Sequence, residues 1–82
     1  MIYDVSNFDE DLKDFYLRVG KNVKNARISK NLTQEELAHL LNFKATSSIS
    51  NREIFYKNSH FSLSHLYKIS LVLDIELSSL IK

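Results

Sequence analysis

Apolar side chains recur every three or four residues early in the chain, which is the period of one face of a helix. They are Phe8, Leu12, Phe15, Tyr16, Val19, Val23 and Ala26. This spacing predicts a helix from about Asp9 to Lys30. Gly20 lies inside it and costs about 1 kcal/mol relative to alanine. We therefore expect a kink at Gly20, or the join between an N-terminal extension and the domain proper.

A second helix has a clear start at Thr33. Thr33 and Glu36 have the spacing of a capping box, in which each side chain accepts a hydrogen bond from a backbone N–H group of the other residue. Three leucines follow at helical spacing and should face inward: Leu37, Leu40 and Leu41.

A third helix should span about Ala45 to Ile54, with Ile49 as its inward anchor. Its other side chains are mostly short hydrogen-bonding groups, unlike the long charged groups of an ordinary surface helix. They are Thr46, Ser47, Ser48, Ser50, Asn51 and Arg52. Such a face can approach another surface closely, and a DNA major groove about 12 Å wide admits one helix. The alternative is a serine-rich, weakly helical loop that binds nothing.

Two further helices complete the pattern. The fourth should run from Ser62 or Leu63 to Leu73 and bury five apolar residues, namely Leu63, Leu66, Ile69, Val72 and Leu73. A last helix should pass through Leu77 and Leu80. The chain has no proline, one glycine and no alternating strand pattern. These features predict an all-α fold, a compact bundle of about five helices.

Composition is that of one small folded domain, with 82 residues of which 44% are apolar and 26% charged. Cysteine is absent, which excludes disulfides and cysteine-based zinc sites and suits a reducing compartment. No segment approaches the roughly 20 apolar residues of a membrane span. We expect a soluble, cytoplasmic protein with no membrane partner.

The net charge of +1 hides an uneven distribution. Residues 1–15 carry five acids against one lysine, a balance of −4, and the remaining residues carry ten basic side chains against five acids, a balance of +5. We therefore divide the chain into an acidic N-terminal extension, residues 1–16, partly continuous with the first helix, and a domain with a positive charge balance, residues 17–82. Five basic residues without an intervening acid could meet phosphates or merely solvate a helix: Arg18, Lys21, Lys24, Arg27 and Lys30.

Two segments resemble the Xre or Cro type helix-turn-helix family of bacterial and phage transcription regulators. Leu32 to Ala38 is similar to the family's L-T-Q-E-E-L-A pattern, and Ile49 to Glu53 resembles its I-S-x-x-E segment. The resemblance extends over about Val19 to Ile81. It implies the lambda-repressor-like fold and a sequence-specific regulator that binds double-stranded DNA.

The resemblance also implies residue roles. Gln34 would contact a phosphate and steady the recognition helix, and an Arg27–Glu53 ion pair would be structural. Three residues would face base edges, namely Thr46, Ser47 and Asn51. Lys44, Ser48 and Ser50 would lie nearer the DNA backbone. Independently of the resemblance, we expect DNA contacts from Arg52, on the polar face of the third helix, and from Lys57 and Asn58, which follow it.

Three departures from the family pattern leave questions open. The turn before Ile49 has one extra residue, so the third helix could begin at Lys44, Ala45 or Thr46. Arg52 falls where the family usually places an apolar core residue. After Glu53 the chain has about two extra residues, so that either Ile54 packs inward or an apolar patch is exposed.

Catalytic and metal-binding patterns are absent from the sequence. The three histidines lack carboxylates at ligand spacing, no serine has a nucleophile setting, and no glycine-rich phosphate loop exists. We expect neither an enzyme nor a cofactor.

Two kinds of partner remain besides DNA. The last segment is rich in apolar residues, which predict either a homodimer seam or a cap on the core: Ile75, Leu77, Leu80 and Ile81. A homodimeric repressor or activator would read a palindromic operator. Alternatively, the protein is an interaction module, such as an antitoxin or antirepressor, whose acidic arm holds a partner protein through Ile2, Tyr3, Val5 and Phe8. The arm could equally fold back on the domain or be disordered.

Overall fold

Four α-helices and three short 3-10 helices form the part of the chain that the computed structural model describes, residues 2–82. In chain order they are η1 (Val5–Asn7), α1 (Phe8–Ser29), α2 (Gln34–Leu40), α3 (Ser47–Glu53), η2 (Tyr56–Asn58), α4 (Leu63–Leu73) and η3 (Leu77–Leu80). The all-α prediction is confirmed. The fifth helix that the sequence predicted is only the short 3-10 helix η3. None of the described helices has both the length and the hydropathy needed to cross a membrane.

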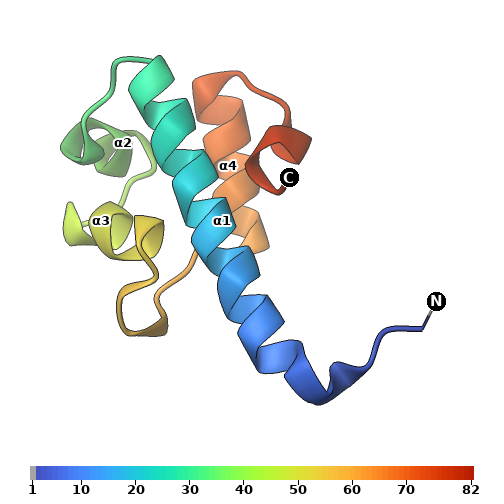
Figure 1. Cartoon of the computed structure of the whole chain (residues 1–82). Helices are drawn as coiled ribbons and strands as arrows, with labels where there is room; N and C mark the ends of the chain where they lie inside the picture. Colours follow the sequence, from blue (N-terminus) through green and yellow to red (C-terminus); the bar gives the residue numbers. More distant parts are fainter. Residues whose placement is uncertain (1) are drawn as a thin grey trace.

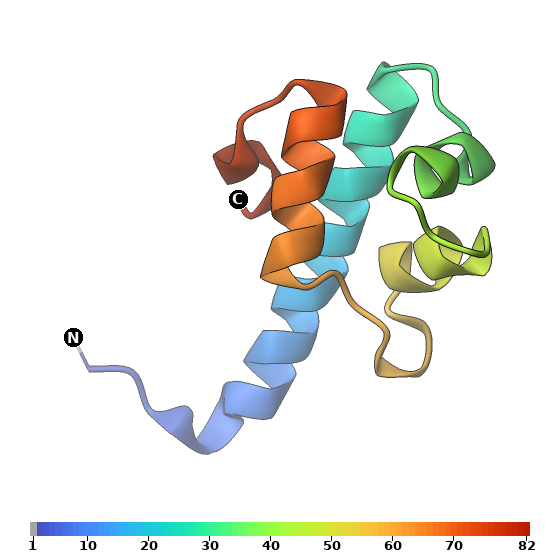
Figure 2. The same ribbon diagram turned by 180° about the vertical axis from the view of Figure 1, so that it is seen from behind.

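The long helix α1 is the spine of the molecule. The helix α4 runs beside it, and α2 with α3 pack on its other side (Figures 1 and 2). The first turns of α1 extend beyond the rest of the domain and carry the N-terminus away from it (Figure 1). Burial along α1 begins with the half-buried Leu12, Phe15 and Tyr16 and becomes complete at Val19 and Val23.

Gly20 marks the closest approach of α1 to α3, and α1 continues through it without a break. A Cβ atom at this position would lie 2.5 Å from the backbone oxygen of Glu53 and 2.8 Å from that of Arg52. The expected kink is therefore wrong. Glycine is required here by the space between the two helices.

The core draws on every α-helix and on η3. Its fully buried members include Val19, Val23, Leu37, Leu41, Ile49, Ile69 and Leu80. Three leucine and valine side chains expected in it are instead exposed: Leu40 at 49%, Leu63 at 69% and Val72 at 36%. Each lies on the flank of its helix, beside the buried positions and not among them, because helical spacing alone does not fix the width of the buried face.

Three helices end at asparagine or aspartate in the left-handed conformation, where glycine is more usual. Asn31 and Asn42 both have φ of 61°, and Asp74 has φ of 55°. Each turn is closed by a hydrogen bond from the following N–H to a carbonyl five residues earlier, as in Leu32 N–H to Arg27 O at 3.1 Å. These residues let a chain with one glycine make tight turns between its helices.

The C-terminal segment is tied to α1. The Arg18 guanidinium donates to the Lys82 carbonyl at 2.9 Å, and the Asn22 amide donates to the Leu80 carbonyl at 3.1 Å. Leu80 is fully buried, and Ile75 and Leu77 pack against the core half-buried, which leaves Ile81 at 40% exposure. Of the two roles expected for this segment, the structure supports the cap on the core, and Leu80 is not accessible to a second chain.

Candidate nucleic-acid interface

The predicted capping box at the start of α2 is present. The Thr33 hydroxyl accepts from the Glu36 backbone N–H at 3.0 Å, and the Glu36 carboxylate accepts from the Thr33 N–H at 2.9 Å. The backbone hydrogen bond from Thr33 holds the pKa of Glu36 below its usual value, because it stabilises the charged form. The capping box fixes the first residue of α2, Gln34, and thereby the direction in which the Gln34 side chain points.

The first residue of α3 is Ser47, and Thr46 is its N-cap. The Thr46 carbonyl accepts from the Ile49 N–H at 2.9 Å and from the Ser50 N–H at 3.1 Å. The extra residue in the turn is accommodated before the helix, after the left-handed Asn42. Helix α3 therefore begins one residue after Thr46, the latest of the three starts that the sequence left open, and it ends at Glu53, one residue before the predicted end.

One side of α3 is buried and the other carries the short polar residues. Ile49 is 0% exposed and Glu53 is 4% exposed, and both point into the domain. An α-helix has 3.6 residues per turn, so Ser47 and Asn51 lie together on the side of α3 opposite Ile49. Ser48 and Ser50 lie on the flanks of this outward side. Ser47 and Thr46 are exposed and the other three are half-buried.

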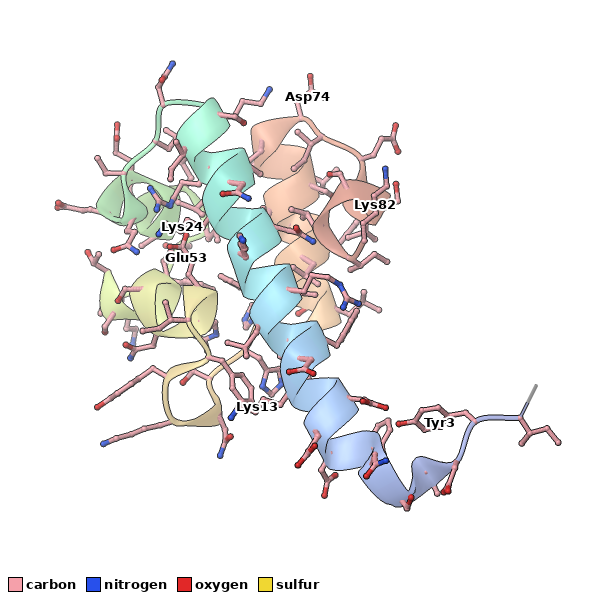
Figure 3. All side chains as sticks on the ribbon, viewed as in Figure 1. Tyr3, Lys13, Lys24, Glu53, Asp74 and Lys82 are labelled. Carbon is pink, nitrogen blue, oxygen red and sulfur yellow. The ribbon has the colours of Figure 1, made fainter. Side chains whose placement is uncertain are left out.

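Three side chains anchor the end of α3 from behind. The Glu53 carboxylate accepts from Arg27 Nε at 2.9 Å and Nη2 at 3.3 Å, and the Gln34 side-chain amide donates to it at 2.9 Å. Arg27 also donates to the Leu32 carbonyl at 2.7 Å. Glu53 lies where α3 faces α1 (Figure 3). The ion pair thus joins α1, α2 and α3, and it is buried, as expected of a structural pair.

Arg52 is held inside the domain, contrary to its predicted DNA-binding role. Its guanidinium donates to the His60 carbonyl at 3.1 Å and to the Ser48 carbonyl at 2.8 Å, and it lies 5.5 Å from the centre of the Phe43 ring. Arg52 therefore replaces an apolar core residue by satisfying backbone carbonyls and stacking on an aromatic ring. It ties α3 to the segment that follows it.

The segment after α3 exposes apolar side chains. The helix ends at Glu53, and Ile54 and Tyr56 are 62% and 49% exposed. Of the two alternatives for Ile54, exposure is therefore correct. Lys57 and Asn58 are exposed beside them. Both adopt left-handed backbone conformations, with φ of 48° and 66°.

Two lysines of α1 come close to the end of α3, a grouping that the sequence did not predict. Lys21 and Lys24 line a surface hollow of about 410 Å³ together with Leu17, Asn25, Glu53 and Ile54. Figure 3 shows Lys24 and Glu53 where α1 faces α3. The spacing of three residues between Lys21 and Lys24 places them on one face of α1, but only the packing of α1 on α3 shows that this face borders the C-terminal end of α3. We name this hollow the basic hollow.

A comparison with known protein families assigns most of this chain to one family. The helix-turn-helix family model matches residues 23–80, a stretch that contains α2, α3, α4 and both partners of the Arg27–Glu53 pair. The chain belongs to the Xre/Cro-type helix-turn-helix family. The comparison with curated proteins found no match, and neither did the comparison with solved structures. Family membership supports a DNA-binding helix-turn-helix regulator.

The start of α1 lies outside the matched stretch but packs against the helix-turn-helix domain. The rings of Tyr16 and His60 stack with centroids 3.9 Å apart, and Phe55 lies 5.7 Å from Tyr16. This aromatic cluster holds the segment after α3 against α1. His65 also has a structural role, because it completes a capping box with Ser62 at the start of α4. Residues 2–82 hold no cluster of three histidines or acids able to ligate a metal.

Proposed function

We propose that this helix-turn-helix protein is a sequence-specific regulator that places α3 in the major groove of double-stranded DNA. The outward face of α3 supports this proposal most strongly. Ser47 and Asn51 can reach base edges from it, and Thr46, the N-cap, is exposed at the N-terminal end of the helix. Meanwhile Glu53 and Gly20 fix the helix to α1 from behind. A recognition helix must be held in this way, since a small rotation would move every base contact.

Phosphate contacts would come from residues around this face. Lys44, Lys57 and Asn58 are exposed on the segments before and after α3, and Ser48 and Ser50 lie on its flanks. A side-chain amide has two N–H donors, so Gln34 can hold Glu53 with one and a phosphate with the other. Lys21 and Lys24 are further candidates because they border the same side of the domain.

Selection of bound sequences from random duplex DNA tests the proposal. We expect one enriched sequence, and an affinity that falls steeply as salt concentration rises. Asn51→Ala should relax the preference at one base position, while Lys44→Ala should weaken binding to all sequences and reduce the salt slope by about one. Ser78→Ala, in η3, and Lys82→Ala are matched controls, since the C-terminal segment that carries both lies on the far side of α1 from α3 (Figures 1 and 3). Absence of any enriched sequence would refute sequence-specific binding.

We further propose that the regulator is a homodimeric repressor of a palindromic operator. The predicted seam is revised, because Leu80 is buried and the other residues of that set mostly cover the core. A different set of exposed apolar residues follows α4 at intervals of four: Leu63 at 69%, Tyr67 at 57% and Leu71 at 63% exposure. We name them the α4 stripe. Residues four apart in a helix share one face, so these three can meet the same stripe of a second copy.

A further inference from the structure

The first residues of the chain form an exposed apolar surface that the DNA-binding proposal does not use. In the N-terminal arm, residues 2–15, the exposed fractions of Val5 and Phe8 are 71% and 49%. Tyr3, Val5 and Phe8 also line an apolar groove of about 380 Å³ with Leu12 and Phe15. The Tyr3 hydroxyl donates to the Asp11 carboxylate, which holds the start of the arm against α1. The arm is thus an ordered surface.

The charge on this arm limits what can cover it. Its five acids, against Lys13 alone, are Asp4, Asp9, Glu10, Asp11 and Asp14. Like charges repel, so neither DNA nor a second acidic arm is a favourable partner. A covering surface should combine apolar side chains with lysine or arginine.

The basic hollow has this chemistry. It presents Leu17 and Ile54, which are 37% and 62% exposed, and two lysines border it. Residues 16–82 as a whole carry a charge of +5, against −4 for the arm. The chain therefore contains both an acidic apolar arm and a basic apolar hollow that would receive it.

Val5 and Phe8, at the start of the arm, cannot reach the lysines of the hollow in their own chain. Phe8 and Lys24 both belong to α1, which is unbroken between them. At a rise of 1.5 Å per residue, these two residues are about 24 Å apart along one rigid helix. Figure 1 shows the arm leading away from α3. Only a second copy can bring an arm to the hollow.

We propose that two copies of this chain exchange their arms, so that the arm of each packs into the basic hollow of the other. The reciprocal contact closes at two subunits, whereas a one-sided contact would produce open chains. The exchanged arm covers Lys21, Lys24 and Ile54 beside α3. It therefore competes with DNA, a consequence that rests on the proposed function, whereas the association itself does not.

Charge reversal on the two surfaces tests the association. Asp9→Lys/Glu10→Lys/Asp14→Lys changes the charge of the arm from −4 to +2 and keeps the Tyr3–Asp11 hydrogen bond, and Lys21→Glu/Lys24→Glu reverses the charge of the hollow. In sedimentation equilibrium at low salt, we expect each variant alone to dissociate at least tenfold more readily than the unchanged chain. Their equimolar mixture should associate again, because both of its contacts pair opposite charges. High salt should break the arm contacts and leave association through the α4 stripe in place.

The variants are compared a second time with Tyr67→Glu added to every chain, which removes association through the α4 stripe. Circular dichroism confirms that each chain is folded. If the arm variant associates as tightly as the unchanged chain, or if the mixture remains monomeric, arm exchange is wrong.

A charge-neutral variant tests the competition with DNA. Phe8→Ser removes an exposed apolar contact and leaves the net charge unchanged, so any gain in DNA affinity cannot come from charge. We expect it to associate at least tenfold more weakly and to bind DNA more tightly at protein concentrations where the unchanged chain is paired. If Phe8→Ser associates more weakly but does not bind DNA more tightly, the exchanged arm does not compete with DNA. If no chain binds DNA while Phe8→Ser still weakens association, the proposed function fails and arm exchange stands.

Discussion

Gly20 shows how one residue can have opposite meanings in a sequence and in a structure. Inside a helix, glycine costs about 1 kcal/mol relative to alanine, so Gly20→Ala should stabilise an isolated helix. In the domain the added methyl group would meet the backbone of α3, with Glu53 O only 2.5 Å away. Backbone atoms cannot swing aside as a flexible side chain does. We expect Gly20→Ala to destabilise the domain by about 1–3 kcal/mol, as overpacking does.

Urea unfolding measures this effect. Asn25→Ala, at an exposed position of the same helix, is the control and should be neutral or slightly stabilising. A gain in unfolding free energy from Gly20→Ala would show that α1 and α3 do not approach each other as closely as described.

Glu53 holds three helices together through one carboxylate. Because it is buried, Glu53→Ala leaves the Arg27 guanidinium without its partner, a loss that typically costs about 3–5 kcal/mol. Gln34→Ala removes one hydrogen bond to the same carboxylate and should cost about 1–3 kcal/mol. Thermal unfolding should therefore show a much larger loss for Glu53→Ala than for Gln34→Ala. DNA binding lost by Glu53→Ala with unchanged thermal stability would contradict the structural role of the pair.

At the scale of the element, the start of α4 depends on an uncharged histidine. The Ser62 hydroxyl accepts from the His65 N–H at 3.2 Å, and His65 Nδ1 accepts from the Ser62 N–H at 3.0 Å. A protonated Nδ1 carries a hydrogen and cannot accept, so protonation breaks half of this box. Burial lowers the pKa of His65 below its usual 6.5, and the charges of Arg52, Lys68 and His60 lower it further.

The sign of the resulting pH dependence follows from linkage. Below pH 6.5 the unfolded chain binds a proton at His65 more readily than the folded chain does. The free energy of unfolding therefore decreases as the pH is lowered. The contribution of His65 is complete above this pH and declines as pH drops toward the folded pKa. His65→Gln keeps an acceptor at this position of the box and should flatten the decline in urea unfolding between pH 7 and about 5. His39→Gln, at an exposed position of α2, should leave it in place.

The elements that sequence predicted well are those fixed by local chemistry. The boundaries of α1, the box at Thr33 and the start of α4 near Ser62 all follow from spacing and capping within a few residues. Leu40 and Arg52 were placed wrongly, since their environments depend on segments distant in sequence. The exposure of Leu40 depends on how wide a face α2 buries, and Arg52 turns inward because the His60 carbonyl lies within reach. The first residue of α3 could not be predicted from the sequence either, because it depends on the conformation of the turn that follows Asn42.

At the scale of the whole molecule, the site is a surface made by four segments. The outward side of α3 provides the short polar groups, and the segments around it add Lys44 and Lys57. α1 contributes the lysines of the basic hollow. The sequence predicted the first two contributions, but it left open whether the basic residues of α1 meet phosphates or only solvent, because their place beside α3 depends on how the two helices pack. A DNA face and an apolar α4 stripe on the same small domain are what a dimeric reader of a palindrome needs.

Dimerisation through the α4 stripe makes a prediction that separates dimer formation from DNA reading. Tyr67→Glu places a charge in the middle of the stripe, where contact with a second copy would remove its water. We therefore expect this variant to be a monomer in sedimentation at high salt, a condition that also suppresses arm exchange. Its affinity for a full palindrome should fall at least tenfold, while its affinity for a single half-site should be unchanged, because α3 is untouched. Ser78→Glu, with the same added charge on exposed η3, should affect neither measurement. If Tyr67→Glu is still a dimer, or if it loses equal affinity for the palindrome and for the half-site, the dimer seam lies elsewhere. Only a contact between two subunits makes the protein bind a palindrome more tightly than a single half-site.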